Sequence, residues 1–237
     1  MKAFNGSQKF KNELLKKALE HKSADDYVAG TFGEMKAFGF KGCSVGCTIY
    51  DIDSTHEKND HEFLATKLGV PLFVVHLQDT LFEGKSNKSA WTYDFLKSIN
   101  VNSDLTSVLP KILLYIVQLN PSKESYFEIV VKILKDWIEN GFVDEEKAKL
   151  ASLEEDYLAT HSSLDVCTAA LAASTVCESL VENTANWAAK AATKTSANAL
   201  SRDTAFAATS KEWEAIEQKI FDDIAEEFLI LIRECHD

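Results

Sequence analysis

Proline and glycine are scarce in this chain, which has three prolines and nine glycines in 237 residues. Sandwiches and barrels of β-strands need turn residues every 8 to 12 positions or so, and this composition argues against them. Long, uninterrupted secondary-structure elements are therefore expected, and helices are the best candidates. Because 46% of the residues are apolar, the chain can also fill a substantial buried core. The composition predicts an all-α globular protein.

Extended basic surfaces and long apolar runs are also missing. The only basic cluster, formed by Lys9, Lys11, Lys16 and Lys17, is expected to be a solvated helix face. The formal net charge is -12, whereas a nucleic-acid surface needs clustered Lys and Arg, so we expect no nucleic-acid partner. No run of about 18 uncharged apolar residues occurs, so we expect no membrane span. The first residues, "MKAFNGSQKF", lack the apolar core of a cleaved signal peptide. We expect a soluble, cytoplasmic protein, or one exported without cleavage of its N-terminus.

Several signatures of known chemistry are absent as well. Five cysteines, an odd number spread over a long chain, do not form a disulfide framework and fit reduced thiols. The chain has no glycine-rich phosphate loop, no G-x-S-x-G elbow and no H-E-x-x-H zinc motif. Nucleotide binding and serine hydrolysis therefore have no support in the sequence.

Helical spacing of apolar residues dominates what is present. Caps, glycines and prolines mark the helix ends, and the pattern predicts helices over about 7–21, 61–68, 71–83, 90–99, 104–120 and 122–140. A further helical turn is expected to begin at Cys43 or Ser44. The intervening stretch 30–42 holds four glycines and is predicted to be an irregular loop. These elements make up a helical body over residues 1–143.

The last third has a different composition. Residues 144–208 contain neither proline nor glycine and are rich in alanine, which has the highest helix propensity and lets helices approach closely. We predict a long alanine-rich helix or helix pair within 144–237, packed on the body or used for association into a homo-oligomer. A final helix is expected from Ser210, and the residues expected to face inwards are Trp213, Ile216, Ile220, Ile224, Phe228 and Leu231.

Four motifs in the first half occur in a fixed order. They are "KGCSVGCTIYD" at 41–51, "HEFLATKLGVP" at 61–71, "LQDTLFEG" at 77–84 and "FLKSINVNSDLTSVLP" at 95–110. This set resembles a group of bacterial and phage-encoded proteins with K-G-C-x-V-G-C, H-x(6)-L-G-I-P and L-E-D-x-I-F-E-G motifs and an alanine-rich C-terminal part. The resemblance implies no reaction, since the group has no established activity. It nominates the positions Lys41, Gly42, Cys43, Gly46, Cys47, His61, Asp79, Glu83 and Gly84, whereas Gln78 and Ala65 depart from the group's pattern.

Cys43 is the candidate nucleophile. If it opens a helix after Gly42, its sulfur lies near unpaired backbone N–H groups, and with Lys41 adjacent the pKa of the thiol would be lowered. His61 or His76 would then act as the base and Asp79 or Glu83 would orient it. The alternative for Cys43 is an inert, buried thiol.

Zinc binding is a further alternative. Cys43, Cys47, His61 and one of His76 or Asp79 would make a tetrahedral set, although a single C-x(3)-C is a weak signal. A Cys43–Cys47 disulfide would need a non-helical turn, because Cβ atoms four residues apart on a helix are about 6 Å apart, beyond the roughly 4 Å of a disulfide. Zinc is the one cofactor that the sequence leaves open.

His76, Asp79 and Glu83 recur at intervals of three and four, so they share one face of the predicted helix over 71–83. That face either lines a cleft or is solvated. Taken together, these patterns favour a helical binding or interaction protein with a polar site near Cys43. A cysteine-dependent hydrolase or transferase is the second hypothesis, and a zinc-binding protein is the third.

Overall fold

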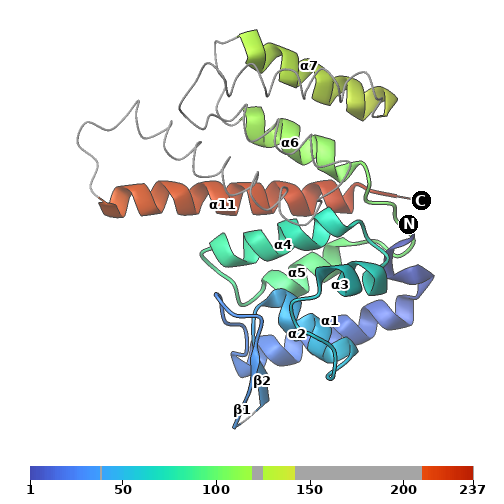
Figure 1. Ribbon diagram of the computed structural model, residues 1–237, viewed down its shortest axis with the longest axis vertical. Coiled ribbons are helices and arrows are strands. Elements are labelled where there is room, and N and C mark those ends of the chain that lie inside the picture. The colour runs from blue at the N-terminus through green and yellow to red at the C-terminus, as the bar shows by residue number, and fades with distance from the viewer. Residues whose placement is uncertain (38, 119–124, 142–209, 237) are drawn as a thin grey trace. The chain divides into compact units, whose positions relative to one another are not determined.

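A computed structural model describes residues 1–37, 39–118, 125–141 and 210–236, and most of these residues are helical (Figure 1). The chain forms two compact units, one of Met1–Thr106 with Phe228–Asp237 and one of Ser107–Glu227. The prediction of a mostly helical chain is confirmed for the described residues. The alanine-rich stretch 144–208 and the boundary at 143 lie outside them, so both stay predictions.

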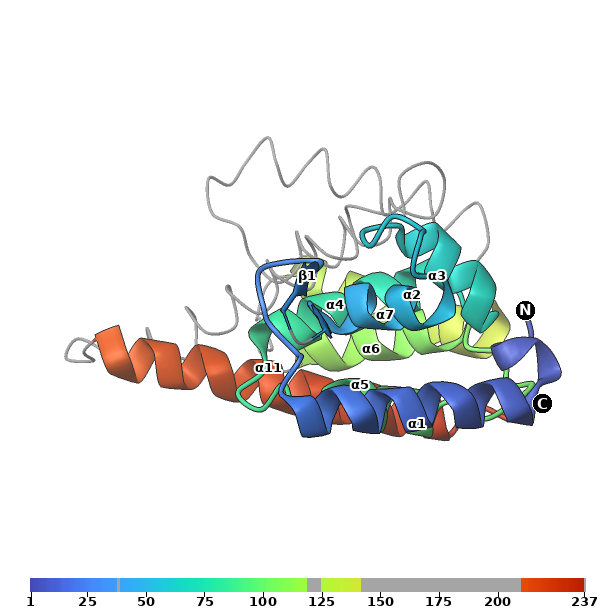
Figure 2. The same ribbon diagram turned by 90° about the horizontal axis from the view of Figure 1, so that it is seen from below.

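The first unit carries most of the elements. Its 3₁₀-helix η1 spans Ala3–Gly6, and it continues with α1 (Gln8–Ala24), β1 (Glu34–Lys36), β2 (Gly39–Lys41), α2 (Ser44–Ile52), α3 (His61–Leu68), α4 (Leu72–Gly84) and α5 (Trp91–Ser98). Helix α1 packs against α5 and α2, and α3 packs against α4. Both views show α1 running alongside α5 (Figure 2).

Three of the predicted helix ends agree with the structure, whereas the helix predicted from Asp104 begins at Val108. Ser7 caps α1, because its side chain accepts a hydrogen bond from the N–H of Phe10 at 3.1 Å. Gly69 ends α3 in the left-handed conformation, with φ of 66°. Pro71 immediately precedes α4, a position that lacks a helical N–H partner in any case.

The predicted irregular loop contains a short antiparallel hairpin instead. Strands β1 and β2 pair in the register Glu34↔Lys41, Met35↔Phe40 and Lys36↔Gly39. Gly33 and Gly39 adopt φ of 127° and 137°, which residues with side chains avoid, and these positions lie next to and within the hairpin. Strands of three residues are too short to show an alternating pattern, so the glycines are the only sequence signal for this hairpin.

Helix α4 is the most deeply buried helix segment of the first unit. Every residue from Phe73 to Phe82 is buried, polar side chains included. Trp91 of α5 anchors one side of it, since its indole N–H donates to the carbonyl oxygen of Gln78 at 3.0 Å. This burial means that polar groups on α4 face protein and not water.

The second unit contains α6 (Val108–Gln118), α7 (Ser125–Asn140) and the greater part of α11 (Ser210–Arg233), whose last residues belong to the first unit. Helix α6 packs against α7, with Ile112 and Leu134 among the buried side chains. Of the residues predicted to face inwards in the final helix, Ile224, Phe228 and Leu231 are buried. The burial of the other three, Trp213, Ile216 and Ile220, lies outside what the structure describes. Across the described segments, no helix is both long and apolar enough to cross a membrane.

Candidate functional site

Cys43 lies at the start of α2, where the sequence predicted a helix to begin. It is the N-cap residue, and its sulfur accepts a hydrogen bond from the N–H of Gly46 at 3.4 Å. Ser44, the next residue, ties this turn to α4 because its hydroxyl donates to Oε1 of Gln78 at 2.8 Å. The cysteine side chain is 1% exposed. The start of α2 is therefore a buried, fixed point against α4.

The two glycines of the "KGCSVGC" motif allow a close approach of another backbone segment. A Cβ atom on Gly46 would lie 1.5 Å from the carbonyl oxygen of Phe32, and one on Gly42 would lie 2.5 Å from the same atom. No side chain fits at either distance without movement of that backbone. The motif glycines are thus explained by the segment before the hairpin, which crosses the start of α2.

We call residues 27–33, between α1 and β1, the strap. The N–H of Val28 donates to the carbonyl oxygen of Gly42 at 2.8 Å, and the N–H of Cys43 donates to that of Thr31 at 2.9 Å. At its middle, the N–H of Gly30 donates to Oε2 of Glu83 at 2.8 Å. The strap therefore joins the start of α2 to the end of α4.

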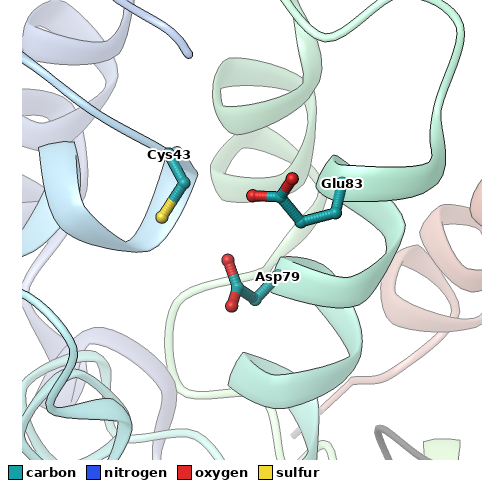
Figure 3. A group of neighbouring side chains, drawn as sticks. All are labelled: Cys43, Asp79 and Glu83. Atoms are coloured by element: carbon teal, nitrogen blue, oxygen red, sulfur yellow. The ribbon is translucent and has the colours of Figure 1, made fainter. Parts of the chain in front are cut away.

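Two carboxylates of α4 point towards Cys43. Asp79 and Glu83 are one turn apart on the helix, and their side chains extend to the side on which the sulfur lies (Figure 3). One ligand atom from each of Cys43, Asp79 and Glu83 lies within 4.8 Å of the other two. In the part of the chain that the structure describes, this is the one group of three or more His, Cys, Asp or Glu side chains with metal-binding proximity.

His61 contacts one of the two carboxylate oxygens of Asp79. Its Nε2 lies 3.1 Å from Oδ2 of Asp79, and its Nδ1 lies 2.9 Å from the carbonyl oxygen of Asn59. Oδ1 of Asp79 is buried and has no hydrogen-bond partner among the residues that the structure describes. Buried polar atoms almost always have a partner, so this carboxylate oxygen beside a thiol and a second carboxylate is a feature that the function of the site has to explain.

His76 is one turn before Asp79 on α4 and stacks on His61, with ring centroids 4.4 Å apart. Burial, together with the positive charge of His61, lowers the pKa of His76 from 6.5 to about 4. Its Nε2 is buried and has no hydrogen-bond partner in the described part of the chain. With His76 and Asp79 at 4% and 9% exposure, the interpretation of this face as solvated is wrong.

The electrostatics of Cys43 are the reverse of those expected from the sequence. Burial raises the pKa of the Cys43 thiol, and the charge of Asp79 raises it further, against hydrogen bonds from the backbone N–H groups of Gly46 and Val45. Lys41 does not offset this rise in the pKa of Cys43, because its Nζ donates to the carbonyl oxygen of Asp25 at 2.8 Å. The predicted lowering of this pKa is wrong, and the nucleophile hypothesis loses its physical basis.

Cys47 is placed apart from the group around Cys43. Its thiol donates to the carbonyl oxygen of Gly42 at 3.5 Å, and burial raises its pKa to about 12. The N–H of Cys47 donates to the carbonyl oxygen of Cys43 at 3.0 Å, so the two cysteines have regular helical spacing, and both are free thiols.

Of the predicted zinc ligands, Cys43 and the alternative ligand Asp79 belong to the compact group. His61 is outside it and contacts Asp79. Glu83 was predicted to orient a base and not to bind metal. The i, i+4 spacing of Asp79 and Glu83 was the available signal for a carboxylate pair. For the position of the strap, the only signal in the sequence was its glycines.

Comparisons with protein families, with curated proteins and with solved structures find no match. The chemistry of the site therefore rests on its own residues.

Proposed function

We propose that this protein binds a divalent transition-metal ion, zinc foremost, through Cys43, Asp79 and Glu83. The observation that carries the proposal is the compact group itself, in which the buried Cys43 and Asp79 and the half-buried Glu83 place a thiol and two carboxylates within 4.8 Å of one another. Carboxylates placed together away from water repel each other, and a cation between them removes that cost. The unpaired Oδ1 of Asp79 supports the same conclusion.

The donor atoms suit zinc better than magnesium or calcium. Zinc accepts thiolate sulfur and carboxylate oxygen in a tetrahedral arrangement, and three protein ligands leave a fourth position for water or another group. A thiolate ligand disfavours Mg²⁺ and Ca²⁺, which prefer oxygen donors alone. The pKa of the Cys43 thiol, raised by burial and by Asp79, is no obstacle, because a coordinating metal removes the proton from a thiol.

Each proposed ligand is oriented by a second group. Nε2 of His61 contacts Oδ2 of Asp79, the N–H of Gly30 donates to Oε2 of Glu83, and the N–H of Gly46 donates to the sulfur of Cys43. Such outer hydrogen bonds set the direction of metal ligands and are a regular part of metal sites. The resemblance to the bacterial and phage group nominated the same three ligand positions, and it stays a prediction.

The test is metal binding by the full chain after removal of metal with a chelator. Calorimetric titration with Zn²⁺ should give one ion per chain, and Co²⁺ should give the absorption band of a thiolate–cobalt bond. Cys43→Ser and Asp79→Asn should each weaken zinc binding by more than about 100-fold, the upper end of the effect of outer-shell changes. Cys47→Ser is the matched control, because Cys47 is equally buried and one turn away.

Two outcomes would contradict the proposal. One is a wild-type protein that takes up no zinc or cobalt, and the other is zinc binding that survives Cys43→Ser but is lost in Cys47→Ser. The interaction role expected from the alanine-rich helices stays a prediction, since those helices lie outside the described residues. The cysteine-dependent enzyme gains no support from a buried thiol of raised pKa.

A further inference from the structure

We infer that metal binding and closure of the strap are one coupled equilibrium: the ion holds the strap closed, and the strap limits exchange of the ion with solvent. The inference rests on the proposed metal site and adds its regulation. It is carried by the contacts of the strap, residues 27–33, with the elements that bear the ligands.

The strap touches each element of the site. It is bonded to the start of α2 through the N–H of Cys43 and the carbonyl oxygen of Thr31, at 2.9 Å. It is bonded to α4 through the N–H of Gly30 and Oε2 of Glu83, at 2.8 Å. It covers α3 with the ring of Phe32, whose edge meets the ring of His61 at a centroid distance of 5.8 Å. The three contacts therefore reach the ligand Cys43, the ligand Glu83 and His61. His61 in turn orients the third ligand, Asp79.

The strap also has features of a segment that opens locally. Gly30 and Gly33 adopt positive φ of 78° and 127° on either side of Thr31 and Phe32, so two flexible positions flank the contact residues. Gly30 and Thr31 are exposed, and 41% of Phe32 is accessible to solvent. Exposed backbone hydrogen bonds, such as the one from Gly30 to Glu83, are typical of segments that open locally.

Glu83 couples ion binding to closure of the strap. Without an ion, its carboxylate lies beside that of Asp79 and the two repel, which disfavours the position from which Oε2 accepts the hydrogen bond of Gly30. An ion bound by Asp79 and Glu83 removes this repulsion and fixes the acceptor. The strap then closes onto a preformed partner. Because coupling between two binding events is reciprocal, a closed strap must strengthen ion binding by the same factor.

Amide hydrogen exchange in the full chain tests the coupling directly. Peptides covering residues 27–35 and 42–47 should exchange about tenfold more slowly with saturating Zn²⁺ than with chelator, a factor inside the usual range for coupled sites. Peptides from α1 should not change, because no residue of α1 belongs to the group of ligands. Zinc occupancy is measured in the same samples by elemental analysis.

A kinetic measurement tests the opposite direction. Phe32→Ala removes the strap's ring contact with His61 and leaves all three ligands in place. We expect the ion to leave this variant about tenfold faster, measured by transfer of zinc to a chromophoric chelator. Met35→Ala is the matched control, because Met35 is a 64% exposed apolar residue of the adjoining strand β1. Its release rate should equal that of the wild type.

The results separate this inference from the proposed function. Zinc bound at one ion per chain, with exchange over 27–35 unchanged by the ion, overturns the coupling and leaves the metal site intact. Equal release rates for the wild type and Phe32→Ala also overturn it. A wild-type chain that binds no zinc overturns the metal site and, with it, the coupling. Slower amide exchange in the zinc-bound wild type, together with faster zinc release from Phe32→Ala, supports both the metal site and its coupling to the strap.

Discussion

The buried, neutral His76 should make the metal-free protein sensitive to mild acid. The side chain is 4% exposed, and burial, with the charge of His61, lowers its pKa from 6.5 to about 4. In the unfolded chain it takes up a proton near pH 6.5, whereas in the folded chain it stays neutral until about pH 4. The unfolded state therefore gains protons first, and stability falls as the pH falls through this window.

The size of the effect follows from the two pKa values. At about 1.4 kcal/mol for each pH unit, the difference between 6.5 and about 4 corresponds to roughly 3 kcal/mol of unfolding free energy. All of it is present above pH 6.5, and almost all is lost at pH 4. A loss of that size is a large part of the stability of a typical domain.

The assay compares the wild type with His76→Gln, which keeps a polar side chain but does not titrate. Urea unfolding is measured from pH 7 to pH 4 in the presence of chelator, and hydrogen exchange in α4 assigns the transition to the first unit. The free-energy gap between the two proteins should shift in favour of the variant by roughly 3 kcal/mol over this range.

Leu19→Gln, a change at a 43% exposed position of α1, serves as the control and should follow the wild type at every pH. Parallel curves for the wild type and His76→Gln would refute a neutral, buried His76. The comparison also removes the contribution of the other acidic groups, since these are the same in both proteins.

Three further results are expected. In metal-free native protein, Cys43 should resist alkylation at pH 8 and react fully once the chain is unfolded, because burial keeps its thiol protonated; mass spectrometry of the labelled peptide checks this, and rapid native labelling would contradict it. His61→Leu should weaken zinc binding by about 10- to 100-fold while His61→Gln, which can still donate to Asp79, should recover part of the loss; equal affinities would argue against an orienting role. Gly46→Ala should lower the free energy of unfolding by about 3 kcal/mol, since its Cβ would meet the carbonyl oxygen of Phe32, and a variant as stable as the wild type in urea would contradict that close approach.

Much of the fold follows from signals that act over a few residues. Ser7, Gly69 and Pro71 mark helix ends through caps and backbone conformations that do not depend on the rest of the chain. The hairpin was missed because its strands span only three residues each, and its pairing depends on glycine conformations that a sequence pattern does not specify. Local rules predict helices well here because most helix ends carry such a signal.

The candidate site was predicted in part. Cys43, Asp79 and Glu83 were all singled out, and their spacing placed the two carboxylates on one face of a helix. The predicted lowering of the Cys43 pKa was wrong, because that pKa depends on burial and on the neighbours contributed by distant segments. The contact between Gly30 and Glu83 joins residues 53 positions apart, and no local pattern predicts such a contact.

The thiol of Cys43 shows why adjacency in sequence is a poor guide to electrostatics. Lys41 is two residues away, yet its ammonium group turns to the carbonyl oxygen of Asp25 and lies 3.7 Å from Asp26, so its charge is used elsewhere. Asp79 is 36 positions away, yet its charge acts on the sulfur. A helix N-terminus alone cannot offset burial and a nearby carboxylate together. A cation can, and a cation would also satisfy Oδ1 of Asp79. The proposed ion would take the place of the thiol proton of Cys43 and would pair the free oxygen of Asp79, whereas a catalytic cysteine would leave that oxygen unpaired.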